Sequence, residues 1–357
     1  MVVNFKKAVL TVCAFCIGVG LVAFSEGVRN GVSDSIELCI STVIPSLFLF
    51  TALAVFFVKS GSATAIGRVV DPFSRVVFCL SGEQFAVMTV SFVSGYPVGA
   101  RLINELYLAG RATASQAQRM LDFCVCGGPA FIVLAVGEAT LGSHSDGVRL
   151  LAAHIASAVI MALASRLLSF GKNKASLAPT PQSAPEAKPL SLVFTLSVTD
   201  AARSMFGISA FVIAFGGLGG MLSSLEFLAP CVTKTLIALS EVTVGVGQFG
   251  RKELPTIAFL LGFGGISVHF QVLSAVSSLR FTYPRLLLSR TVHGTLSAIL
   301  IALFESVSPR VINTAVGSTA PSPRLHGSPF AVAALLLMGA VLIFYSSDAK
   351  ASFFRKE

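Results

Sequence analysis

Charged residues are scarce in this chain. Only 12% of its 357 residues are charged, whereas 54% are hydrophobic. A soluble domain carries about 25% charged residues. So few charges cannot cover a surface that faces water, which excludes a soluble domain, a disordered protein and a fibrous repeat. Long apolar runs are present instead, and they predict an all-α, polytopic helical membrane protein.

Tryptophan is absent and only four tyrosines occur, so an interfacial aromatic belt would depend on those few tyrosines. The cysteines number seven, and most lie inside apolar runs, which argues against a disulfide framework. The net charge of +9 fits the excess of Lys and Arg in cytoplasmic loops. We therefore expect membrane lipid, and no nucleic acid, as a partner.

The order of apolar runs predicts two related halves. Residues 1–170 form the first half, 190–345 form the second, and 346–357 form a short basic tail. A Pro-, Ala- and Ser-rich linker at 171–189 joins the halves. The expected spans are 8–24, 36–58 with a kink at Pro45, 148–170, 205–222 after a polar helix start at 200–204, 286–304 and 329–345. The segment 67–80 alternates apolar and charged residues and is expected to lie at the membrane interface.

Two apolar runs are only about half a bilayer long, and each stops at a glycine-rich break. The run 84–93 stops at 94–100, and the run 254–263 stops at 264–269. A shift of 170 residues places one break on the other, and a short helix is expected after each, at 101–109 and 271–279. Interrupted helices at matching positions of two repeats indicate a transporter binding site. Whether the repeats are inverted or parallel stays open.

The first break is suited to an anion. Gly95, Pro97 and Gly99 prevent a continuous helix. The helix that restarts there offers free N–H groups and a positive dipole end. Arg101 adds a full charge in its first turn. The alternative is a surface loop in which Arg101 faces water. The predicted substrate-binding residues of this break are Ser94, Gly95, Tyr96, Pro97, Gly99 and Arg101.

The second break repeats this arrangement with Gly264 and Gly265. Ser267, His269 and Gln271 follow at a spacing of two. In an extended segment they would line one side, whereas in a helix they would fan out. We predict that they donate or accept hydrogen bonds with a substrate. The alternative is a histidine whose hydrogen bonds are satisfied among packed helices.

Several other residues are candidates for coupling or gating. A carboxylate at Glu241, with Thr243, is suited to an ion or a proton but equally to an interface. His154 and His293 lie inside apolar spans, either as proton relays or as helix–helix hydrogen bonds. A third break is expected at Gly128 and Pro129.

Motifs for catalysis and for cofactors are not found. Cys124 and Cys126 lack a matching Cys or His pair, so no metal site is predicted. The segment 245–250 matches G-x-G-x-x-G, but no strand precedes it. Neither H-E-x-x-H, a Walker lysine motif nor a nucleophile elbow is found. We expect neither an enzyme nor a cofactor.

Four segments taken in order resemble a known family. They are 94–101, 123–129 (FCVCGGP), 241–243 (EVT) and 262–271 (GFGGISVHFQ). Together they resemble the YlbJ-type sporulation integral membrane proteins, which carry nucleoside-recognition (Gate) domains. The resemblance implies a polytopic protein of endospore formation, linked to passage of dipicolinic acid across the membrane around the forespore. This sequence departs from the pattern at Val125, Gly127 and Val244.

The sequence thus predicts a permease for a small organic anion, with dipicolinate as the expected substrate. Dipicolinate is a small planar dianion, which suits a helix N-terminus and Arg101. The alternatives are a non-transporting assembly factor of sporulation membranes and a transporter of nucleosides or other neutral solutes. We expect an integral protein of the bacterial cell membrane, specifically the membrane around the forespore. Partners left open are a homo-oligomer and other sporulation membrane proteins.

Overall fold

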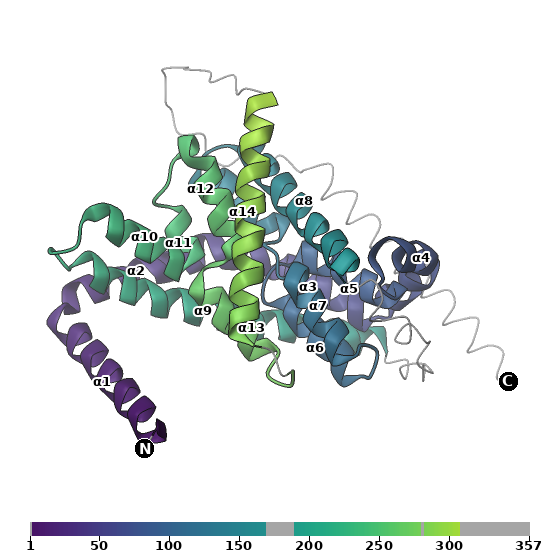
Figure 1. The fold of residues 1–357 in the computed structure, drawn as a ribbon, viewed down its shortest axis with the longest axis horizontal. Helices are drawn as coiled ribbons and strands as arrows, with labels where there is room; N and C mark the ends of the chain where they lie inside the picture. Colours follow the sequence, from purple (N-terminus) through teal and green to yellow (C-terminus); the bar gives the residue numbers. More distant parts are fainter. Residues whose placement is uncertain (1, 169–188, 280–281, 308–357) are drawn as a thin grey trace. The chain divides into compact units, whose positions relative to one another are not determined.

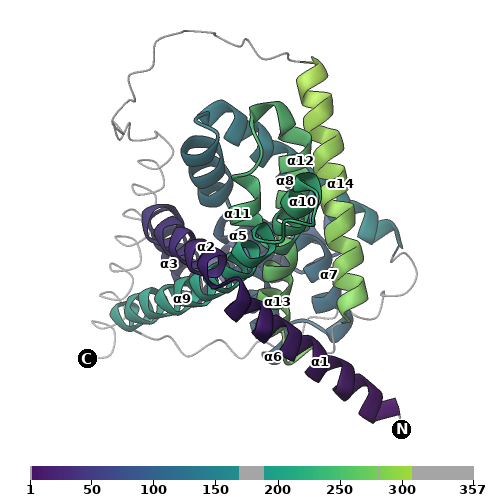
Figure 2. The same cartoon turned by 90° about the vertical axis from the view of Figure 1, so that its left-hand side faces the viewer.

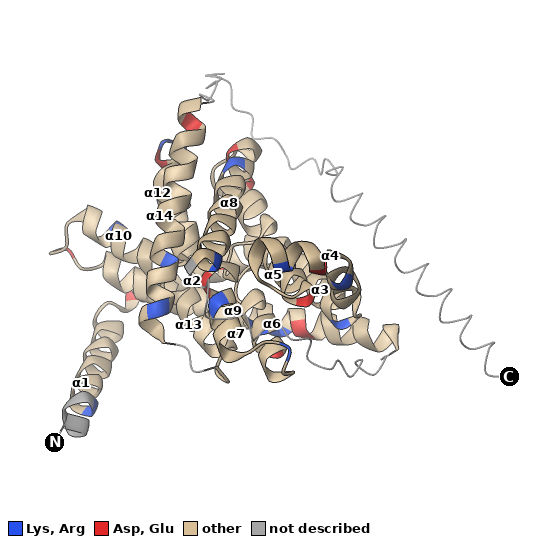
Figure 3. Cartoon of the chain, turned by 45° about the vertical axis from the view of Figure 1, so that its right-hand side comes forward, with Lys and Arg blue, Asp and Glu red and all other residues tan. Residues whose placement is uncertain are grey.

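The computed structural model describes residues 2–168, 189–279 and 282–307. Every regular element in these residues is helical, which confirms the predicted all-α class (Figure 1). The described residues hold five helices long and apolar enough to cross a membrane, or six if one bent pair counts as a span. Figure 3 shows how thinly charged residues are spread over these helices. The predicted linker up to 188, the span at 329–345 and the tail lie outside the described residues.

The first half opens with α1 (Val2–Ala23), followed by a helical run of 35 residues from Ser25 to Lys59. That run comprises α2 (Ser25–Leu38), a π-helical turn η1 (Cys39–Val43) and α3 (Ile44–Lys59). The span predicted at 36–58 lies within this longer helix, which the polar α2 extends at its N-terminal end. Pro45 lies in the first turn of α3, where its missing N–H is tolerated.

The next pair of helices, α4 (Ser62–Phe78) and α5 (Gly82–Ser94), is bent by 86°. Ser81 caps α5 in a capping box with Gln84. The Asp71 carboxylate accepts a hydrogen bond from the Gly82 N–H at 2.7 Å, which ties the bend together. The segment predicted to lie at the interface, 67–80, makes up most of α4 and the bend.

The remaining helices of the first half are α6 (Val98–Leu108), α7 (Ala114–Cys124), the π-helical η2 (Ala130–Thr140) and α8 (His144–Leu168). The span predicted at 148–170 corresponds to α8. The short helix predicted at 101–109 starts three residues earlier, at Val98.

The second half begins with α9 (Leu190–Ser223), a helix of 34 residues. The helix start predicted at 200–204 was wrong, because the helix runs unbroken through those polar residues. It is followed by α10 (Pro230–Ser240), α11 (Val242–Val246), the short η4 (Arg251–Glu253), α12 (Leu254–Phe263), α13 (Gly265–Ala275) and α14 (Tyr283–Val307). The short helix predicted at 271–279 begins at Gly265 instead.

Helices of the two halves pack against each other within residues 1–309, which form one compact unit. α2 lies along α9 in both views, and α8 packs on α14 (Figures 1 and 2). At the α2–α9 crossing, a Cβ added to Gly220 would lie 2.1 Å from the Gly27 carbonyl oxygen. Such close contact between backbones is typical of small-residue packing in membrane helices.

Candidate functional site

Both predicted breaks end a short helix at a glycine with positive φ. α5 ends at Ser94, Gly95 has a φ of 79°, and α6 restarts at Val98. α12 ends at Phe263, Gly264 has a φ of 84°, and α13 restarts at once. A side chain is disfavoured at such φ values, so glycine fits both positions. The second break is one residue long, which is shorter than the predicted 264–269.

The two breaks meet inside the protein. The Tyr96 hydroxyl in the first break donates a hydrogen bond to the Leu261 carbonyl oxygen of α12 at 2.7 Å. The third predicted break joins them, because a Cβ on Gly95 would lie 3.0 Å from the Gly128 nitrogen. Segments more than 160 residues apart in the sequence are thus brought to one place.

A cavity lies where these breaks meet. Its empty space is about 440 Å³, including its open mouth. It is lined by residues of η1, α3, α9, α11, α13 and η2, by the end of α5 and by the breaks. Seven lining residues were predicted from the sequence: Ser94, Gly95, Tyr96, Gly128, Glu241, Thr243 and Gln271. The other lining residues are apolar: Val43, Leu47, Phe131, Ile208, Val212, Val242 and Val268. The lining is therefore mainly apolar with a few polar groups, as small-molecule sites usually are.

Glu241 is the charged residue of this lining. It is the N-cap of α11. Its carboxylate accepts hydrogen bonds from the Val244 N–H at 2.7 Å and from the Thr243 hydroxyl at 3.2 Å. Its side chain is almost fully buried, with 1% exposure. The carboxylate is therefore held in one place, away from bulk water.

The polar residues after Gly264 fan out, because they are helical. Gln271 reaches the cavity and donates to the Ser267 hydroxyl at 3.3 Å. Ser267 and His269 are fully buried and do not line the cavity. His269 Nε2 is 2.9 Å from the carbonyl oxygen of Phe263, the last residue of α12, so the imidazole is within hydrogen-bond distance of the C-terminal end of that helix. Of the two arrangements considered for these residues, the structure has the helical one.

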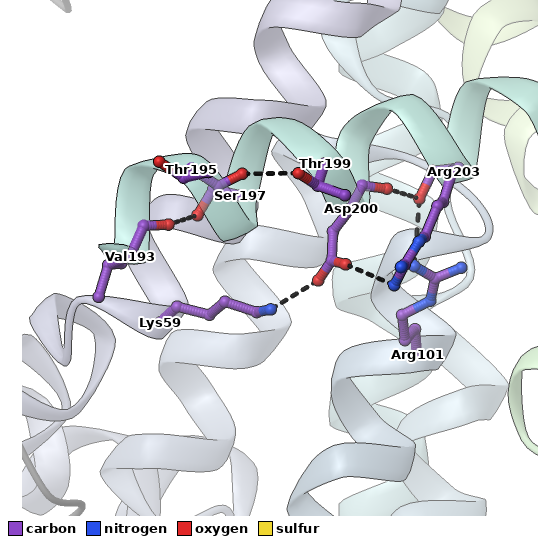
Figure 4. A network of polar contacts seen from close by, with 9 residues as sticks. Lys59, Arg101, Val193, Thr195, Ser197, Thr199, Asp200 and Arg203 are labelled. Carbon is purple, nitrogen blue, oxygen red and sulfur yellow. Dashed lines mark hydrogen bonds and ion pairs between the residues drawn. The ribbon is translucent and has the colours of Figure 1, made fainter. Parts of the chain in front are cut away.

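Arg101 lies beside the cavity rather than on its wall. Its Nη1 donates to the Ser204 hydroxyl of α9 at 3.3 Å. Ser204 precedes the lining residue Ile208 by one helical turn, about 6 Å along the axis. One turn before Ser204, the Asp200 carboxylate accepts a hydrogen bond from the Lys59 ammonium at 2.6 Å. It also forms an ion pair with the exposed Arg203 at 3.7 Å (Figure 4). Arg101 thus binds α9 at Ser204, one helical turn from Asp200, and the Asp200 carboxylate itself pairs with Lys59 and Arg203.

The other predicted site residues support the packing. Pro97 caps α6, and a Cβ on Gly99 would lie 3.0 Å from the Cys124 carbonyl oxygen. A Cβ on Gly265 would lie 3.0 Å from the Val242 nitrogen, beside the α11 cap. Pro129 starts η2. These residues hold the breaks in contact and lie outside the lining.

Arg290 is a further candidate that was not predicted from the sequence. This residue of α14 is fully buried, and its guanidinium donates to the carbonyl oxygens of Asp122 and Val125. It forms no ion pair within the described part of the chain, because the Asp122 carboxylate binds Arg285. A full charge inside the apolar run 286–304 was the signal that could have identified it.

Arg290 places its charge next to the cavity wall. The guanidinium donates to the Val125 carbonyl oxygen, and Val125 lies three residues before the lining residue Gly128. The positive charge is thus behind the wall that the first and third breaks form.

His154 and His293 form the contact between α8 and α14. Their rings lie 4.4 Å apart, and His293 Nε2 is 3.0 Å from the His154 carbonyl oxygen. Together with Cys126 they bring three ligand atoms within 4.8 Å of one another. Arg290 Nη1, however, lies 3.1 Å from His293 Nδ1. A buried guanidinium at that nitrogen opposes a metal cation there.

Comparison with known proteins supports the predicted resemblance. No family model matches the chain, and no solved structure matches it. The chain is 23% identical over 301 residues to the sporulation integral membrane protein YlbJ of Bacillus subtilis (strain 168), covering 73% of each. It resembles a sporulation membrane protein. This confirms the YlbJ-type resemblance and an integral membrane location, and supports a membrane role in sporulation. The nucleoside-recognition (Gate) domains stay a prediction.

Proposed function

We propose that the chain is a permease for a small organic anion, with dipicolinate in endospore formation as the expected substrate. The observation that carries this proposal is the cavity at the meeting of three helix breaks, with the buried Arg290 charge behind its wall. Broken helices around a central cavity are how many transporters bind their solutes. A buried cation without a carboxylate partner attracts an anion.

The expected substrate follows from the similarity to a sporulation membrane protein and from the resemblance stated above. Dipicolinate carries two carboxylates on a flat ring, so its charge matches Arg290 and Arg101. The apolar lining, including Phe131 and Val268, offers a surface for the ring. We place its action in the membrane around the forespore.

Transport is tested with the purified protein in proteoliposomes. Uptake of labelled dipicolinate and labelled uridine is measured side by side. Saturable uptake of dipicolinate without uridine uptake supports the proposal. Uptake of neither solute by well-folded protein contradicts it and favours a non-transporting assembly role.

Arg101→Ala is predicted to reduce dipicolinate uptake by about tenfold or more while the protein still inserts and purifies normally. The reason is that Arg101 donates to Ser204, one helical turn from the lining residue Ile208. At about 10 Å and an effective dielectric constant of about 20, its attraction for one negative charge is about 1.7 kcal/mol. The matched control is Arg68→Ala, which removes an exposed arginine on α4. Normal uptake by Arg101→Ala would show that Arg101 has no part in transport.

A second candidate is a transporter of nucleosides or other neutral solutes. Glu241, Gln271 and Ser94 favour it, because they offer the cavity hydrogen-bonding groups suited to hydroxyls and amides. Uridine uptake that is insensitive to Arg101→Ala would support this candidate over the anion permease.

A further inference from the structure

The cavity proposed for an anion is itself lined by a carboxyl group. Among the described residues of the lining, Glu241 is the only one with a carboxyl or basic side chain. It is 1% exposed, and its hydrogen bonds come from the Val244 N–H and the Thr243 hydroxyl. It forms no ion pair in the part of the chain that the structure describes. An ionised Glu241 would therefore leave a negative charge uncompensated in the wall.

The titratable groups around Glu241 do not neutralise it. Those that interact with it electrostatically are Cys39 of η1 and Tyr96 of the first break. Neither is a cation. α12 and α11 contain no titratable residue.

On the other packed elements, titratable side chains are engaged elsewhere. Lys234 of α10 pairs with Glu253, Glu138 of η2 pairs with His144, and His269 of α13 contacts the Phe263 carbonyl oxygen. Asp200 and Arg203 of α9 belong to the group around Lys59. The remaining titratable residue of α10 is Cys231, which is exposed. Arg290 of α14 donates to the Val125 and Asp122 carbonyl oxygens and forms no ion pair with Glu241.

A charged substrate and a charged Glu241 would repel each other inside the cavity. Two like charges at short range in a medium of low dielectric constant interact unfavourably. Burial also favours the neutral form of a carboxyl group. Proton uptake by Glu241 removes the repulsion and converts the group into a hydrogen-bond donor. The O–H can then donate to a carboxylate oxygen of the substrate.

We propose that Glu241 is a proton-coupling site, so that an organic anion and a proton cross the membrane together. This inference rests on the proposed permease function. One proton from water forms an O–H bond with a Glu241 carboxylate oxygen as the anion enters from one side. The same O–H bond breaks when the anion leaves, and the proton returns to water on the other side. No other bond forms or breaks.

The test measures dipicolinate accumulation in proteoliposomes whose membrane potential is held at zero with valinomycin and equal potassium. The outside is made one pH unit more acidic than the inside. Coupling of one proton to one anion allows accumulation up to about tenfold above the external concentration. We expect this in the native protein, together with acidification of the lumen reported by an enclosed pH dye.

Glu241→Gln keeps a neutral side chain of the same shape. We expect this variant to equilibrate dipicolinate without accumulating it and without acidifying the lumen. Glu138→Gln is the matched control, because Glu138 lies on η2 away from the lining and pairs with His144. It should accumulate dipicolinate like the native protein. Glu241→Asp, which keeps a titratable carboxyl, should retain part of the acidification.

The outcomes separate this inference from the proposed function. Proton coupling would be overturned if the native protein took up dipicolinate without acidifying the lumen, or if a sodium gradient drove uptake instead. Either result would leave the proposed permease function standing. Accumulation by Glu241→Gln equal to that of the native protein would overturn the role of Glu241. Absence of dipicolinate uptake under every gradient would contradict the permease itself. The dye measurement on native protein decides proton coupling by itself, and Glu241→Asp tests the role of the carboxyl group if Glu241→Gln fails to fold.

Discussion

At the scale of single residues, the buried guanidinium of Arg290 is the feature that most constrains function. It donates to the carbonyl oxygens of Asp122 and Val125 at the end of α7 and contacts His293, yet forms no ion pair among the described residues. Replacing it with methionine should lower the preference for dipicolinate over the neutral pyridine-2,6-dicarboxamide. With each substrate carboxylate on the order of 10 Å away and an effective dielectric constant near 20, the loss is about 15-fold for each unit of substrate charge. Competition between the two compounds in the uptake assay measures it.

Arg290→Lys serves as the paired variant, because it keeps the charge but cannot reach both carbonyl oxygens as the planar guanidinium does. The preference for the dianion should survive in the lysine variant. Equal loss in both variants would mean that Arg290 acts through the shape of the break and not through its charge. Size-exclusion chromatography in detergent checks that each variant is folded.

At the scale of helices, the α2–α9 crossing depends on glycines. Gly27 and Gly31 of α2 face Gly216 and Gly220 of α9 at backbone contact. Gly220→Val should separate the helices, since the new Cβ would lie 2.1 Å from the Gly27 carbonyl oxygen. Overpacking of this kind costs about 1–3 kcal/mol or more. We expect a lower thermal midpoint of aggregation in detergent.

Gly207→Val provides the control on the same helix. Gly207 has no atom within 4 Å of its added Cβ, so its replacement should leave the thermal midpoint unchanged. An equal fall in both variants would indicate that loss of helix flexibility, and not contact with α2, causes the effect.

At the scale of the whole molecule, the halves depend on each other. α8 and α14 are both 25 residues long, and each carries a histidine as its eleventh residue. The hydroxyls of Ser157 and Ser297 lie 2.7 Å apart at their contact. Residues 1–170 and 189–357 produced as two chains in one cell should therefore co-purify through a tag on the first. Each half made alone should aggregate, because the apolar and glycine-lined faces of α2, α8, α9 and α14 lose their partners.

A tagged, unrelated membrane protein produced with residues 189–357 is the control for adventitious capture. Purification of residues 1–170 alone as a monodisperse species would contradict mutual dependence. The prediction concerns assembly only and holds whichever solute the protein carries.

The predicted repeat of two halves can be compared with the observed elements. The break glycines Gly95 and Gly264 are 169 residues apart, one fewer than the predicted shift of 170, and each break is followed by a helix of 11 residues. The histidines of α8 and α14 correspond at a different shift, because α7 and η2 lie between the first break and α8. No single shift could reveal both relations, since the number of residues between matching elements differs in the two halves.

The sequence by itself determined the class of protein and the positions of the breaks. Too few charges exclude a water-facing surface, and Gly95, Pro97 and Gly264 end helices through local backbone sterics. Only the tertiary structure decided which polar groups share a cavity. Gln271 lines the cavity and His269 does not, because α13 is helical from Gly265 onward and points the two side chains in different directions. Arg290 meets the third break only because α14 packs beside α7. Backbone conformation is set by neighbours in the chain, whereas a site is set by residues that folding brings together.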